Sequence, residues 1–344
     1  MFKVFIAEKI LRDILLAESR RPIKERSDLF KILKTAKNLY VAMDATDTEW
    51  IKQLKKEYRL VADTTRTAYI KKIPANPETV LKNPSSLFLL DIPFAEAKKI
   101  QKEYGVMCLS GTDPNITPLI DIYDEHTTDK GEPLSRGWDA VLDSVEQTPS
   151  NALILTDRYL FKTTNPRYGN GFDNIRSILN ELLPRELNTN YHVTVIFDKD
   201  NIDALYDFQT IAKRLNNIKE EFKRPYPITM EVLGISGKND TYHDLHNRRI
   251  VSNYFVVKMD YKLAAFNKNV GTVDQTIIPQ VLFTQESLNG RSSAPLKSMN
   301  QIVSALRDFS NSLSSPRTNH NSYYYAVDGQ WMEKCFAIRN RLIK

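Results

Sequence analysis

Short apolar runs alternate with amphipathic segments of helical period through most of this chain, and this alternation constrains the fold more than any other feature. In the first half, strand-like runs at residues 2–6 and 38–43 are separated by segments in which apolar residues recur at helical spacing. After about residue 150 the pattern starts again, with strand-like runs at residues 152–155 and 193–197. Strands and helices that alternate in this way predict α/β layers.

Length and loop-forming composition predict two domains. The chain has 344 residues, which is enough for two domains of ordinary size. Loop-forming residues gather at 127–137 and again at 147–150. We therefore expect an α/β domain of unknown role over residues 1–149. A second domain over residues 150–344 should hold a mixed sheet flanked by helices, with a C-terminal helical and aromatic extension.

Several elements of the second domain are predicted by their own patterns. A long amphipathic helix is expected over residues 202–221, followed by a strand over 228–235. Residues 276–283 are expected to form a strand at or near the edge of the sheet, because Pro279 cannot donate a ladder hydrogen bond. Apolar residues at helical spacing predict a helix over 295–313.

Composition excludes several classes of protein. Hydrophobic residues make up 42% and charged residues 26% of the chain, as in a globular protein rather than a disordered one. The net charge of +6 favours a polyanionic partner weakly. The two cysteines lie far apart in apolar surroundings, which fits a reducing cytoplasm. The opening apolar run is too short for a signal peptide or a membrane span, so we expect no membrane.

The stretch from His246 to Val257 is where the sequence most resembles a chemical site. An imidazole and two guanidiniums, from His246, Arg248 and Arg249, precede β-branched and aromatic residues typical of a strand. Arginine offers a planar fork of donors that matches phosphate, and histidine serves as a nucleophile or a proton carrier. The pattern indicates a site for an anionic ligand where a loop enters a strand. The alternative is a basic turn on the surface.

The spacing within this stretch is similar to the motif of the phospholipase D superfamily. That motif is His-x-Lys, four further residues and Asp, and here its positions hold His246, Arg248 and Asn253. A downstream Ala-Ala-Phe segment ending at Asn267 and the strand-to-loop segment Asp157-Arg158-Tyr159-Leu160 also resemble parts of such domains. The resemblance covers about residues 150–285 and favours the nuclease branch, with a phospholipase D-like mixed sheet.

The resemblance implies a mechanism and a set of residues. His246 would attack phosphorus, and Arg248 and Arg249 would hold the phosphate. No metal or cofactor would be needed. A second motif is absent, so two copies would have to meet across a homodimer axis. Asn253 removes the charge that a carboxylate would supply, and the nearby acids are candidates to replace it. The residues assigned to substrate binding are Arg249, Asn267, Asp157 and Arg158; the candidate replacement acids are Asp240, Asp244 and Asp157.

Two functions of different class follow. In the first, the protein is a metal-independent phosphodiesterase of the nuclease type, acting on DNA or RNA through His246. In the second, the site is catalytically degenerate and binds phosphate or nucleic acid, within a larger bacterial assembly. Lipid is disfavoured because no amphipathic membrane-binding segment is recognisable.

Two further patterns have competing interpretations. Acidic residues at predicted strand ends are typical of metal-dependent nucleases of the PIN type, but they are equally typical of helix caps and turns. They are Asp44, Asp63, Asp91 and Asp113. Near the C-terminus, Tyr323-Tyr324-Tyr325 and Trp331 predict either a small aromatic core or a surface on which bases stack.

Overall fold

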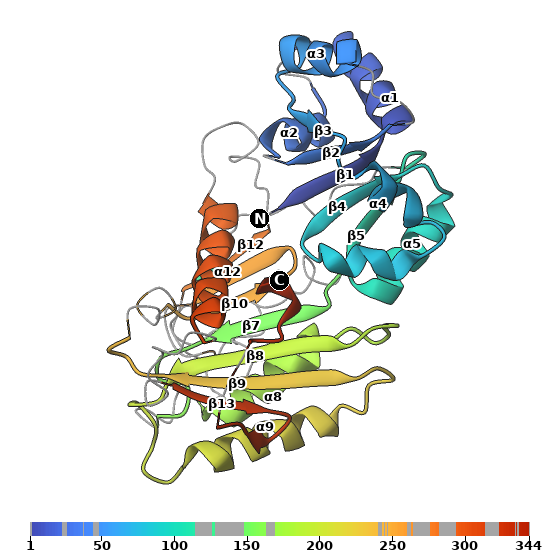
Figure 1. Ribbon diagram of the computed structural model, residues 1–344. Helices are drawn as coiled ribbons and strands as arrows, with labels where there is room; N and C mark the ends of the chain where they lie inside the picture. Colours follow the sequence, from blue (N-terminus) through green and yellow to red (C-terminus); the bar gives the residue numbers. More distant parts are fainter. Residues whose placement is uncertain are drawn as a thin grey trace. The chain divides into compact units, whose positions relative to one another are not determined.

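The alternation of strands and helices builds two sheets, which belong to two compact units. The structure is a computed structural model (Figure 1). It describes residues 2–22, 26–36, 38–43, 48–113, 126–127, 148–162, 169–239, 243, 245, 247–259, 263, 276–281, 294–313, 323–333, 335 and 337–343. Unit 1 comprises Met1–Asp121 and Val281–Leu296, and unit 2 comprises Ile122–Gln280 and Lys297–Lys344.

Unit 1 is built on a five-stranded sheet whose strands follow the order β3-β2-β1-β4-β5. Every pair of neighbours is parallel. The strands are β1 (Lys3–Ala7), β2 (Leu39–Ala42), β3 (Ala62–Asp63), β4 (Ser86–Leu90) and β5 (Met107–Ser110). The helices are α1 (Glu8–Ser19), α2 (Asp28–Thr35), α3 (Thr48–Glu57), α4 (Thr67–Lys72), η2 (Pro77–Lys82) and α5 (Phe94–Tyr104). Strand order reverses between β1 and β4, as in doubly wound folds.

Local chemistry accounts for the helix ends of unit 1. Ser27 caps α2 by accepting a hydrogen bond from the backbone N–H of Phe30. α5 ends at Gly105, whose φ of 60° lies in the left-handed region that glycine adopts without strain. In the core, the Phe5 ring stacks on the Phe88 ring with centroids 5.0 Å apart. This contact ties the two central strands together.

Unit 2 contains a nine-stranded mixed sheet in the order β14-β13-β9-β8-β7-β10-β11-β12-β6. β7, β8 and β9 are parallel neighbours, while β10 and β13 run antiparallel to them. The strands are β6 (His126–Thr127), β7 (Ala152–Thr156), β8 (Tyr191–Asp198), β9 (Ile228–Ile235), β10 (Arg249–Ser252), β11 (Phe255–Met259), β12 (Thr276–Val281), β13 (Tyr323–Val327) and β14 (Gln330–Trp331). The helices are α8 (Gly171–Leu182), α9 (Phe208–Glu221), α12 (Ala294–Ser312) and η5 (Arg341–Ile343).

The main core of unit 2 lies between the sheet and the pair α8 and α9 (Figure 1). Alternate strand residues such as Leu155 and Val195 point into it, as the period of two in a strand requires. The opposite face carries polar side chains as well. There Asn340 donates hydrogen bonds to the Leu153 carbonyl and to Thr194 Oγ1, so the C-terminal segment is fixed across the sheet.

The α/β fold class, with a parallel sheet followed by a mixed sheet flanked by helices, is confirmed. The strand that contains Pro279 was expected at or near the edge of the sheet, and β12 lies next to the edge strand β6. A domain boundary at residue 150 stays a prediction.

Two element predictions are corrected. The helix expected from residue 202 begins at Phe208, because Asp207 caps it by accepting from the backbone N–H of Thr210 at 2.6 Å. The motif strand is two strands: β10 and β11 form an antiparallel hairpin, and its turn contains Asn253 and Tyr254.

Candidate functional site

The carboxyl ends of β7, β8 and β9 meet at one edge of the unit 2 sheet, because these strands are parallel neighbours. β7 is followed by Asp157, β8 ends at Asp198, and β9 is followed by the loop of residues 236–238. β10 runs antiparallel to β7, so its first residue, Arg249, pairs with Thr156 at this same edge. Ligands of open α/β sheets bind outside the carboxyl ends of the strands. This edge is therefore where a site is expected.

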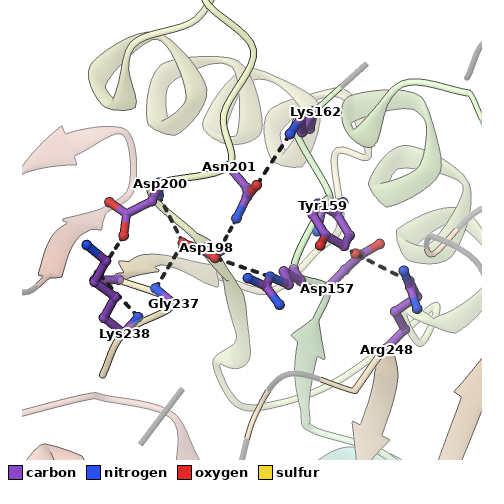
Figure 2. A network of polar contacts seen from close by, with 11 residues as sticks. Asp157, Tyr159, Lys162, Asp198, Asp200, Asn201, Gly237, Lys238 and Arg248 are labelled. Carbon is purple, nitrogen blue, oxygen red and sulfur yellow. Dashed lines mark hydrogen bonds and ion pairs between the residues drawn. The ribbon is translucent and has the colours of Figure 1, made fainter. Parts of the chain in front are cut away.

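Asp198 holds the loop after β9 against the loop after β8 (Figure 2). Its carboxylate is 1% exposed and accepts from the backbone N–H of Gly237 at 3.0 Å and of Asp200 at 2.9 Å. It also accepts from Nδ2 of Asn201 at 2.6 Å. A Cβ at position 237 would clash with Asp198 Oδ2, so any other residue there would displace the carboxylate or the loop. A buried carboxylate is costly unless it is hydrogen-bonded, and these donors offset that cost.

Asp157 has the same position after β7 and organises the other side of the edge. It is 1% exposed and accepts from the backbone N–H of Tyr159 at 2.9 Å and of Leu263 at 3.0 Å. Beside it, Thr156 Oγ1 donates to the carbonyl of Asn247 at 2.6 Å. The sheet thereby fixes the backbone that immediately precedes Arg248.

Two arginines approach these buried carboxylates through Nε, and Figure 2 shows one of them, Arg248, beside Asp157. Arg158 Nε lies 3.4 Å from Asp198 Oδ2, and Arg248 Nε lies 3.8 Å from Asp157 Oδ1. Both Nε atoms are buried without a hydrogen bond, so each pair is held by charge alone. Neither guanidinium donates a hydrogen bond to a residue that the structure describes. Their planar donor forks are therefore available to an anion.

Tyr159 lies among three cations. The guanidinium carbons of Arg158 and Arg248 are 5.3 and 5.9 Å from its ring centroid, and Lys162 Nζ is 5.9 Å away. Further along the edge, Lys199 Nζ lies 5.0 Å from the ring centroid of Tyr324. We call the set of Arg158, Lys162, Lys199, Lys238 and Arg248 the cationic edge. It combines positive charge with aromatic faces, and buried carboxylates fix its two arginines.

Three parts of the predicted site lie outside the described residues. These are His246, Asn267 and the acids Asp240 and Asp244. Of the described residues, Asp157, Arg158 and Arg248 come together at the cationic edge. Their roles stay predictions.

Asn253 lies at the other end of β10 from Arg248. Its Oδ1 accepts from the backbone N–H of Asn151 at 3.0 Å and of Ala152 at 3.2 Å, and its Nδ2 donates to Asn151 Oδ1 at 3.0 Å. It therefore satisfies backbone donors where β7 begins, whereas Asp157 lies where β7 ends. This placement gives no support to a catalytic role for Asn253, and we leave it out of the site.

Arg249 is separated from Arg248 by the sheet. It is 8% exposed, and it alternates with Ile250, which points into the main core. Burial lowers the pKa of Arg249. Lys258 is the cross-strand neighbour of Arg249, and its pKa is lowered mainly by burial and to a lesser extent by the positive charge of Arg249. We therefore do not count Arg249 as a contact of the same ligand as Arg248.

Asp198 was missed by the sequence interpretation, although a signal was present. It ends an apolar strand followed by polar residues, in the same way that Asp157 follows the strand before it. Two parallel strands that both end in Asp would have predicted two carboxylates at one edge. No pattern in the sequence singled out Gly237, because a side chain at position 237 is excluded only by the position of Asp198 in the folded protein.

The described acids at strand ends in unit 1 have roles other than metal binding. Asp44 lies outside the described residues, and within the rest of the described chain no group of three His, Cys, Asp or Glu side chains is placed to hold a metal ion. Asp63 accepts from the backbone N–H of Thr65, which is a turn role, and Asp91 forms an exposed ion pair with Lys9. The metal-nuclease alternative has no support in these residues.

The aromatic cluster near the C-terminus divides between core and surface. Tyr325 is buried and donates to Glu231 Oε1, and the Tyr323 ring packs edge-on against Phe309. Tyr324 and Trp331 are 38% and 48% exposed. The core interpretation therefore holds for two of the tyrosines, and Tyr324 belongs to the surface beside the cationic edge.

Comparisons with known proteins are sparse. No protein-family model matches the sequence, and no curated protein matches it. Among solved structures, a phosphatidylserine synthase from Haemophilus influenzae Rd KW20 is similar over 61% of this chain and 39% of its own, with 10% identity and a TM-score of 0.28. Drosophila Piwi is similar over 83% of this chain and 42% of its own, with 10% identity and a TM-score of 0.14. The chain thus spans less than half the length of either protein, and such TM-scores establish no common fold.

Two other sequence predictions concern the surroundings of the protein. Within the described residues no helix is both long and apolar enough to cross a bilayer. Cys108 and Cys335 are free and buried, and burial raises the pKa of each thiol to about 12. A cytoplasmic location stays a prediction.

Proposed function

We propose that the protein binds a phosphodiester of a single-stranded nucleic acid at the cationic edge of unit 2. The observation that carries this proposal is the pair Arg158 and Arg248, each held against a buried carboxylate through Nε and with no hydrogen bond to a described residue. A guanidinium fixed on one side offers its remaining donors in a preset direction, which suits a phosphate.

The surroundings of the two arginines favour a strand of nucleic acid over an isolated phosphate. Lys162 and Lys238 are exposed on the loops after β7 and β9, so they extend the positive charge along the same edge. Tyr159 and Tyr324 offer aromatic faces at the same edge. Cations that follow a backbone, interleaved with rings on which bases stack, are how proteins bind single strands without reading their sequence.

Salt dependence of binding tests the proposal. Arg248→Ala should weaken the binding of a labelled single-stranded oligonucleotide, measured by fluorescence anisotropy, and reduce the slope of log affinity against log salt by about 0.7. Arg185→Ala is the matched control, because Arg185 is exposed in the loop before β8, at the opposite edge of the sheet. Equal slopes for wild type and Arg248→Ala would place the phosphate elsewhere.

Cleavage is a second candidate function, and it depends on His246. Asn253 is no longer an argument against activity, because it lies at the far end of β10 and holds the backbone of Asn151 and Ala152. The resemblance assigns His246 to nucleophilic attack, and a phosphohistidine route needs no divalent ion. Two copies of the chain would then supply two histidines to one phosphate, so the cleavage function requires a homodimer.

The cleavage candidate makes its own prediction. If oligonucleotide is cut, cutting should persist in EDTA and disappear in His246→Ala, while binding changes little. Product formation on a denaturing gel measures the first, and anisotropy measures the second. Cutting that stops in EDTA but survives His246→Ala would overturn this mechanism. Binding without cutting would leave the protein as a nucleic-acid-binding module.

A further inference from the structure

Unit 1 contains a hollow of about 530 Å³ at the carboxyl edge of its parallel sheet. The ends of three adjacent strands reach it, through Ala7 of β1, Ala42 of β2 and Leu90 of β4. It lies at the point where strand order reverses between β1 and β4, which is where doubly wound sheets hold ligands. Its volume is within the range of about 300–1,000 Å³ that small-molecule sites occupy.

The floor of the hollow is apolar. Ala7, Ala42, Ile70 and Leu90 line it, and the two alanines leave space at strand ends that larger side chains would fill. Pro74 adds a further apolar side, from the turn that follows α4. An apolar floor between strand ends and a helix suits a flat ring whose faces need no hydrogen bonds.

The rim of the hollow is charged with both signs. The cations are Lys9, Arg12 and Lys71, and the acids are Glu8, Asp13 and Asp91. Glu8 is engaged by Arg12, whose Nη2 lies 2.6 Å from Glu8 Oε1. Lys9 and Asp91 face each other from α1 and the end of β4, 3.6 Å apart, with side chains 71% and 55% exposed. An exposed pair of this kind is worth about 0–1 kcal/mol, so a ligand separates it at little cost.

We propose that this hollow binds a nucleoside monophosphate. The base would lie on the apolar floor, Lys9 and Lys71 would take the phosphate, and Asp91 would accept hydrogen bonds from the ribose hydroxyls. A rim of one sign would fit a simple anion or cation, whereas a rim of both signs fits a ligand with an anionic group and hydroxyl donors.

The junction of β1 and α1 sets the number of phosphates. β1 ends at Ala7 and α1 begins at Glu8, with no loop between them. Dinucleotide sites need a glycine-rich turn at this junction, so that the backbone approaches the pyrophosphate closely. Here no glycine stands at the junction, and Glu8 and Lys9 occupy the first two positions of α1. The hollow therefore fits one phosphate on a lysine rather than a pyrophosphate on a backbone cradle.

Isothermal titration calorimetry of the full chain with AMP, with adenosine and with inorganic phosphate, each in a separate titration, tests the proposal. AMP should bind more tightly than either fragment, and Lys9→Glu should weaken AMP at least about tenfold, equivalent to about 1.4 kcal/mol. Lys55→Glu is the matched control, because Lys55 is exposed on α3 and does not line the hollow. Both substitutions change an exposed helical lysine, so neither is expected to unfold the unit.

Three outcomes would overturn the proposal. They are no heat of binding with millimolar AMP, equal binding of AMP and adenosine, or equal effects of Lys9→Glu and Lys55→Glu. The cationic edge is a competing place for AMP, and Arg248→Ala separates the two. AMP binding that is unchanged in Arg248→Ala supports the hollow, whereas AMP binding lost in Arg248→Ala assigns AMP to unit 2.

Discussion

Each unit has its own sheet, and the residues at the carboxyl edge of the strands have different roles in the two sheets. In each, parallel strands end side by side and acidic residues follow them. In unit 2, Asp157 and Asp198 are each 1% exposed and accept backbone hydrogen bonds from neighbouring loops. In unit 1, the Asp91 side chain is 55% exposed and forms an ion pair with Lys9, whose Nζ lies 3.6 Å from Asp91 Oδ1. The residue type and topological position are the same, but the physical role differs.

Burial decides that role. A buried carboxylate must be satisfied by several donors, so it fixes the loops that provide them and orients the arginine beside it. An exposed carboxylate is already solvated, so it constrains little and remains able to change partner. The unit 2 edge is therefore preorganised, and the unit 1 edge is adaptable. This difference suits a fixed phosphate clamp in one and a small ligand with several polar groups in the other.

The largest expected effect is the loss of stability on removing the buried acid. Asp198→Ala leaves the N–H groups of Gly237 and Asp200 without an acceptor and Arg158 without its counter-ion, so it should cost about 3 kcal/mol. Asp91→Ala removes an exposed pair and should cost about 0.5 kcal/mol or less. Urea unfolding, with hydrogen exchange to assign each transition to its unit, measures both.

Asp198→Asn sharpens this test because it keeps the size of the side chain. One oxygen remains for the backbone donors, but an amide N–H would face the donor Nδ2 of Asn201. An intermediate loss is expected. If Asp198→Ala and Asp91→Ala destabilise their units equally, burial is not what distinguishes the two edges.

The sequence predicted the α/β class and most elements because both depend on local periodicity. β9, for example, was expected over the residues that form it, 228–235. The start of α9 was misplaced, because the five residues before Asp207, at 202–206, also fit a helical spacing, and only the cap at Asp207 excludes them from the helix. A single capping hydrogen bond is a weak signal beside a long amphipathic pattern.

The site was predictable in part. Arg248, Asp157 and Arg158 were all named from short motifs, but their pairing was not, since residues 157 and 248 meet through sheet register that no motif encodes. Asn253 was assigned to chemistry because its spacing matched a motif position. Its actual partners, Asn151 and Ala152, lie a hundred residues earlier, and only the alignment of β10 with β7 reveals them.

The smallest expected effect concerns Glu231, which lies within the unit 2 sheet. Desolvation by burial raises its pKa above the ordinary value of 4.5, against the opposing hydrogen bonds from Tyr325, the backbone N–H of Arg339 and Thr194. Between the unfolded pKa and the higher folded pKa, the folded chain therefore keeps a proton that the unfolded chain has released. Its contribution to stability is fully present below the unfolded pKa and is lost as pH rises through the folded pKa.

Glu231→Gln should remove this loss, because an amide carries no charge at either pH. The stability of the variant relative to wild type should therefore increase from pH 4 to pH 7, as measured by the urea midpoint of the unit 2 transition. Glu221→Gln is the control of opposite sign, since the hydrogen bond from Arg176 lowers the pKa of that exposed acid and its contribution is lost as pH falls. Parallel pH curves for wild type and Glu231→Gln would mean that the folded and unfolded chains bind this proton equally.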